Sequence, residues 1–100
     1  MNINALMQQA QKMQKDMLKA QKALDETLFE FTSNGGAIKI KIYGNRKIEK
    51  IDIDNDAIDP EDKEMLEDMI KIAINEAVDK IDEEQEKIQA KLSSGMRMPF

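Results

Sequence analysis

The segment Ala37-Ile38-Lys39-Ile40-Lys41-Ile42-Tyr43 decides the fold. Isoleucines alternate with polar residues through it, and this period of two is typical of a strand with one buried face and one solvated face. Two turn signals enclose the strand, Ser33-Asn34-Gly35-Gly36 before it and Gly44-Asn45 after it. Because both connections are short, we expect an antiparallel neighbour on each side.

The two neighbouring strands are less regular in sequence. Leu28 to Thr32 is a short candidate, with Phe29 and Phe31 on one face. In the segment Arg46 to Ile53, Ile51 and Ile53 are in phase while Ile48 is out of phase, which predicts a bulge or a change of register. The sequence therefore predicts a three-stranded antiparallel sheet within residues 29–53.

A long helix is expected before the sheet, over residues 1–28. This stretch has no Gly or Pro, and its apolar residues recur at heptad positions a and d: Ile3, Ala10, Met17 and Leu24, with Leu6, Met13 and Ala20. The heptads indicate a coiled-coil seam that packs against another helix. An ordinary amphipathic helix packed on the protein's own sheet would give the same short pattern.

A second long helix is expected after the sheet, over residues 59–92, followed by a tail at 93–100. Asp59 suits the N-cap, and Pro60 suits the first helical position because it needs no hydrogen-bond partner there. Whether this helix is continuous or breaks in two near Asp82-Glu83-Glu84 stays open. The whole chain, 1–100, then forms one α+β domain.

The length of the second helix predicts a homodimer. A helix over residues 60–92 would be about 50 Å long, whereas a compact domain of this size has a radius of gyration of about 13 Å. One copy cannot cover such a helix, and a small domain buries little apolar surface by itself. The candidate dimerisation residues are apolar positions of the middle strand and the second helix: Ile38, Ile40, Ile42, Leu66, Ile70 and Ala73.

Composition excludes several classes of chemistry. The chain has neither Cys nor His, so disulfides, Cys/His zinc sites and Ser-His or Cys-His catalytic pairs are excluded. The acidic run 52–56 resembles the start of a calcium loop, but Ala57 and Lys63 stand where Gly and Glu are needed. We therefore expect a non-catalytic protein without cofactor, metal or small-molecule substrate.

The expected cellular location follows from the lack of a membrane-spanning segment and of a signal peptide. No apolar run approaches the ~20 residues that span a bilayer, so no membrane association is expected. Met1 to Met7 lacks the basic and apolar regions of a signal peptide. The sequence therefore predicts a cytoplasmic protein.

Charge is distributed unevenly along the chain. The net charge is −5, but residues 1–50 carry +4 and residues 51–100 carry −9. Four lysines of the first helix, Lys12, Lys15, Lys19 and Lys22, are spaced 3, 4 and 3 residues apart and therefore form one stripe. Such a stripe can follow a phosphate backbone, although the outer face of a coiled coil is also commonly charged.

A second basic group lies in the sheet region: Lys39, Lys41, Arg46 and Lys47. It would enlarge the basic surface if it lay near the lysine stripe, and lysines also protect sheet edges from pairing. Both groups are candidate DNA-binding residues.

Several segments resemble the YbaB/EbfC family of bacterial nucleoid-associated proteins. These are LMQQAQKMQK at 6–15, DID at 52–54, EDKEMLED at 61–68, NEA at 75–77 and SGMRMPF at 94–100. The resemblance spans nearly the whole chain in the same order. It implies a helix, a three-stranded antiparallel sheet and one or two C-terminal helices, assembled as a tweezer-shaped homodimer. It also implies binding of double-stranded DNA, a place in the nucleoid and an influence on nucleoid organisation and gene expression.

Two other functions fit the same residues. In one, the heptad seam and its methionines grip helices of other proteins, so that the chain is a helical interaction module. In the other, the acidic C-terminal half mimics DNA and binds basic proteins.

Overall fold

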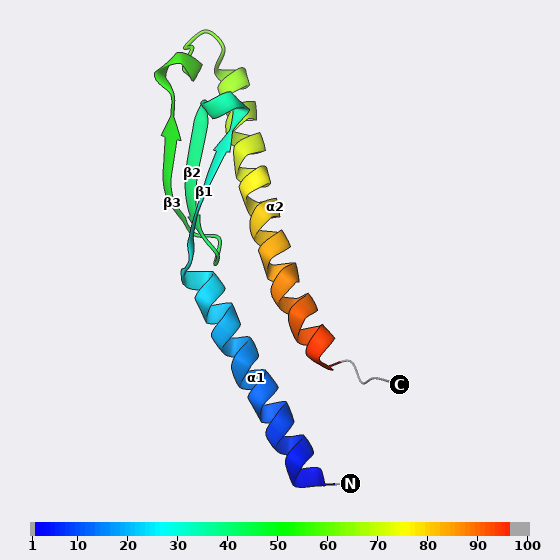
Figure 1. Cartoon of the computed structure of the whole chain (residues 1–100). Helices are drawn as coiled ribbons and strands as arrows, with labels where there is room; N and C mark the ends of the chain where they lie inside the picture. The colour runs from blue at the N-terminus through cyan, green and yellow to red at the C-terminus, as the bar shows by residue number, and fades with distance from the viewer. Residues whose placement is uncertain (1, 97–100) are drawn as a thin grey trace.

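The computed structural model describes residues 2–96, with side chains over residues 2–91. The elements follow in the order α1 (Ile3–Glu26), β1 (Leu28–Ser33), β2 (Ile38–Tyr43), β3 (Ile48–Ile53) and α2 (Lys63–Met96). The predicted α+β class and the order of the elements are confirmed. Figure 1 shows α2 crossing one face of the sheet and continuing beyond it, where it lies beside α1.

The sheet has the order β1-β2-β3, and both pairings are antiparallel. The predicted irregularity at Ile48 is confirmed, because the register between β2 and β3 shifts at Lys41/Ile42. The shift pairs Ile42 with Ile48 and Ile40 with Ile51. Since residues directly opposite one another share a face, the bulge returns Ile48 to the apolar face of the sheet.

The core lies between this apolar face and α2. Ile38, Ile40 and Ile42 are at most 2% exposed and pack against Ala73, Ala77 and Ile81 of the helix. The small side chains of Ala73 and Ala77, four residues apart, allow α2 to lie close to the sheet. Phe29 and Phe31 of β1 stack with ring centroids 6.1 Å apart and extend the core on one side.

The boundaries of the second helix differ from those predicted. The helix begins at Lys63 rather than at Asp59, because the Asp62 carboxylate accepts a hydrogen bond from the Met65 N–H and caps it. Asp59 instead accepts a bond from the Glu61 N–H in the preceding turn. At its other end the helix passes through the expected stop at residues 93–95 and reaches Met96 without a break. Residues 97–100 of the expected tail lie outside the described residues.

The molecule is elongated. Its radius of gyration is 19.9 Å and its extents are 72 × 26 × 16 Å. In Figure 1, α1 and the C-terminal half of α2 extend together from one end of the sheet. We call this pair of helical segments the arm.

Candidate nucleic-acid interface

The arm carries the lysine stripe. Lys12, Lys15, Lys19 and Lys22 are all exposed on α1. They span about 15 Å of helix at 1.5 Å per residue, a length over which duplex DNA carries about nine phosphate charges. The predicted grouping on one helix face is thus compatible with the size of a phosphate-lined surface.

These four ammonium groups differ from the lysines of α2 in their surroundings. Within residues 2–91, none of them forms an ion pair with Asp or Glu. Lysines of α2 differ, because Lys63, Lys71, Lys80 and Lys87 each lie within 4 Å of a carboxylate three or four residues away. The stripe therefore offers uncompensated positive charge, whereas the charge of these α2 lysines is locally balanced.

The second basic group does not form a continuous positive surface like that of the lysine stripe. Lys39 and Lys41 lie on the face of the sheet that points away from α2, opposite Asp52 and beside Glu30, respectively. The Lys41 Nζ is 3.4 Å from the Glu30 Oε1. Lys47 is exposed at the end of the β2–β3 turn, and Arg46 in that turn contacts Asp82 of α2. This group is therefore spread over two sites and partly neutralised.

Most of the residues predicted to mediate dimerisation contribute to the core between the sheet and α2. Ile38, Ile40 and Ile42 are buried beneath α2, Ala73 of α2 is buried against them, and Leu66 and Ile70 of α2 are half-buried. The candidate dimerisation residues did not include Ile48 and Ile51, which are 42% and 38% exposed on the apolar face of β3. The sequence showed Ile51 in phase with Ile53 and Ile48 out of phase, but this pattern could not reveal that α2 covers β1 and β2 instead of β3.

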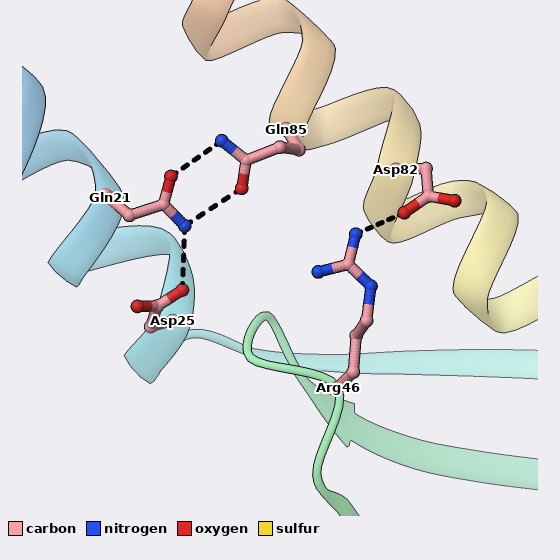
Figure 2. Close-up of polar contacts among 5 residues, drawn as sticks. All are labelled: Gln21, Asp25, Arg46, Asp82 and Gln85. Atoms are coloured by element: carbon pink, nitrogen blue, oxygen red, sulfur yellow. Dashed lines mark hydrogen bonds and ion pairs between the residues drawn. The ribbon is translucent and has the colours of Figure 1, made fainter.

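A second missed feature is a set of polar contacts where the arm joins the sheet. Gln21 of α1 and Gln85 of α2 exchange two side-chain hydrogen bonds, of 2.9 and 2.6 Å. Gln21 also donates to Asp25, at 2.9 Å. Figure 2 shows this pair beside the Arg46–Asp82 contact, which lies one helical turn along α2. We call Gln21, Gln85, Arg46 and Asp82 the root junction.

A groove of about 600 Å³ runs between the two helices of the arm. Its lining residues come from both helices: Gln9, Lys12, Met13, Asp16, Ala20, Ile88 and Lys91. The apolar part of this lining includes Met13 and Ala20, two of the heptad positions. The heptad seam predicted in the first helix therefore packs partly against α2 and partly lines this groove.

A family model for the YbaB/EbfC DNA-binding family matches residues 1–96. The chain belongs to this family. A nucleoid-associated protein of Clostridium novyi is 46% identical over 99 residues, covering 99% of this chain and 87% of the relative. Another, from Chloroflexus aurantiacus, is 41% identical over 100 residues, covering both chains completely. YbaB/EbfC proteins are DNA-binding proteins rather than enzymes, as the sequence predicted.

The fold is also found in a solved structure. The crystal structure of an uncharacterized Helicobacter pylori protein superposes with a TM-score of 0.75 at 20% identity, covering 92% of this chain and 97% of the other. The YbaB/EbfC chain described here has, within residues 2–96, no helix long and apolar enough to cross a membrane.

Proposed function

We propose that the protein is a homodimer that binds duplex DNA mainly through phosphate contacts made by the lysine stripe of each arm. One observation supports this most directly: the four lysines on the projecting α1 are exposed and have no ion-pair partner among residues 2–91. The family membership supports DNA as the ligand. The names of the relatives support a place in the bacterial nucleoid.

The dimer would use the apolar face of β3. Ile48 and Ile51 continue the row of core isoleucines, and α2 leaves them partly open to solvent. A second copy packed on this face would remove the exposed apolar area from water, at about 25 cal/mol per Å². It would also cover an edge strand that otherwise invites pairing with other chains.

Dimerisation matters for affinity. Four phosphate contacts per copy become eight per dimer, within the six to ten that typify salt-dependent DNA binding. Each contact contributes about −0.9 to the slope of log K against log salt, so the dimer should show a slope near −7. Phosphate contacts carry little sequence information. The protein would therefore act broadly, organising nucleoid DNA and influencing gene expression through its occupancy.

The test replaces two lysines of the stripe. Lys15→Glu/Lys19→Glu should weaken duplex binding and reduce the magnitude of the salt slope by about 3.6 per dimer, because two contacts per copy are lost. The matched control, Lys63→Glu/Lys71→Glu, makes the same change in net charge at the far end of α2. Binding measured by fluorescence anisotropy from low to physiological salt distinguishes them. An equal effect of both variants would remove α1 from the interface.

The groove of the arm favours a second candidate function, the helical interaction module. Its lining combines Met13, Ala20 and Ile88, and methionine adapts to varied apolar partners. An Ala20→Trp substitution would fill this groove while leaving the lysine stripe intact. Loss of protein partners with retained DNA binding would favour this second function, and retained partners would remove it.

A further inference from the structure

The root junction lies where α1, the β2–β3 turn and α2 meet. Leu24 near the end of α1 is buried, and Gly44 of the β2–β3 turn packs directly on the Leu24 backbone. The Gly44 N–H also donates to the Thr27 carbonyl, at 3.0 Å. Arg46 in the same turn reaches α2 at Asp82, and Gln85 one turn further along α2 holds Gln21 of α1. The turn thus lies against both helices.

Arg46 occupies an uncommon backbone conformation. Its φ is 74°, in the left-handed region that non-glycine residues rarely adopt. The turn holds it there through the Arg46 N–H, which donates to the Tyr43 carbonyl at 2.8 Å, and through Asn45, whose side chain accepts from the Lys47 N–H at 2.9 Å. A constrained backbone fixes the direction in which the Arg46 side chain leaves the turn. In Figure 2 this side chain extends from the turn to Asp82.

We propose that Arg46 and Gln85 are positioning residues for DNA binding: the root junction fixes the angle of α1 against the sheet, and so sets where each lysine stripe meets the duplex. This inference rests on the proposed function for its DNA readout. It assigns Arg46 to the support of the arm and removes it from the group of phosphate contacts.

The contacts of Arg46 distinguish this role from direct DNA binding. Its guanidinium has a carboxylate partner on α2, whereas the four lysines of the stripe have none within residues 2–91. Arg46 already shares its charge with Asp82 through Nη2, so a phosphate bound to its remaining N–H groups would meet a guanidinium that is partly neutralised. The four lysines of the stripe are exposed and have no such carboxylate partner within residues 2–91, so each can bind a phosphate with its charge undivided.

The first experiment measures the angle of the arm without DNA. The sequence contains no cysteine, so spin labels can be placed cleanly at Gln8→Cys on α1 and Thr32→Cys on the sheet. Labelled chain is mixed with excess unlabelled chain, and double electron–electron resonance gives the distance within one protomer. The parent protein should give a narrow distribution. Arg46→Gln and Gln85→Ala should each broaden or shift it, while Lys50→Gln and Gln89→Ala, matched in charge or size, should leave it unchanged.

A charge swap tests whether the ion pair itself carries the effect. Arg46→Asp with Asp82→Arg exchanges the two partners, and Asp tolerates the left-handed conformation at position 46. The swap should restore the narrow distribution that Arg46→Gln loses. A parent-like distribution in Arg46→Gln and Gln85→Ala would overturn the proposal, and so would a swap that fails to restore it while the protein remains folded by circular dichroism.

Measurements of duplex binding then distinguish a positioning role of Arg46 from a direct contact with phosphate. Arg46→Gln should weaken binding by about twofold to fivefold, as for loss of a half-exposed ion pair, with the salt slope unchanged. A slope reduced by about 0.9 per protomer with an unchanged distance would make Arg46 a phosphate contact and overturn the inference. If the parent protein showed no salt-dependent binding while the distances responded as expected, the proposed DNA-binding function would be wrong. The role of Arg46 and Gln85 in fixing the angle of α1 would still be supported.

Discussion

Gly44 shows how a single residue determines the approach of α1 to the sheet. A Cβ added at this position would clash with the Leu24 carbonyl oxygen, so no other residue fits without moving α1. The sequence indicated only a turn at Gly44-Asn45. The need for glycine comes instead from a contact between residues twenty positions apart, which a local pattern cannot reveal.

Gly44→Ala should therefore lower the free energy of unfolding by about 1–3 kcal/mol, the usual cost of overpacking. Gly35→Asn is the control, because Gly35 has a φ of 67° that Asn tolerates and has open space around its Cβ position. Urea denaturation followed by circular dichroism compares the two variants. Equal stability of both would mean that the contact with Leu24 relaxes freely in solution.

At the scale of elements, the sequence predicted both α-helices and all three strands but not every boundary. Alternating isoleucines and helix-forming residues are local signals, and they located the sheet and both helices. The start of α2 depended on which of two nearby aspartates caps the helix, and both satisfy the same rule. Only the bond from the Met65 N–H to Asp62 decides between them.

This boundary can be tested with two variants. Asp62→Ala removes the N-cap and should cost about 0.5–2 kcal/mol of stability, whereas Asp59→Ala removes only a bond within the preceding turn and should cost less. Thermal denaturation of the two variants gives the comparison. A larger loss in Asp59→Ala would place the helix start at Pro60, as the sequence alone suggested.

The candidate site was less predictable than the fold. The spacing of the four lysines on α1 was sufficient to place them on one exposed stripe, because helical geometry is regular. The contact of Arg46 with Asp82 was not predictable, since the two residues lie 36 positions apart in the sequence. The apolar face left open for a partner was not predictable either, because an apolar strand pattern cannot say which isoleucines the protein's own helix covers.

At the scale of the whole molecule, the exposed face of β3 gives the clearest prediction. Ile51→Glu would place a charge on that face and should convert a dimer into monomers, because an unpaired buried charge is costly. Ile72→Glu is the control, since Ile72 is 43% exposed and lies on α2. Sedimentation equilibrium at micromolar concentration measures the mass of each. A parent protein that is already monomeric would contradict the proposed assembly.

The continuity of α2 has a mechanical consequence. Its 34 residues form one rod of about 51 Å, clamped to the sheet along one half and free of it along the other. A stiff rod transmits tilt: a rotation of about 5° at the clamp would displace the far end by about 2 Å over a free length of ~25 Å. In the proposed dimer, small adjustments where the two copies meet would thus be amplified at the ends of the arms, and the gap between those ends would change without unfolding any helix.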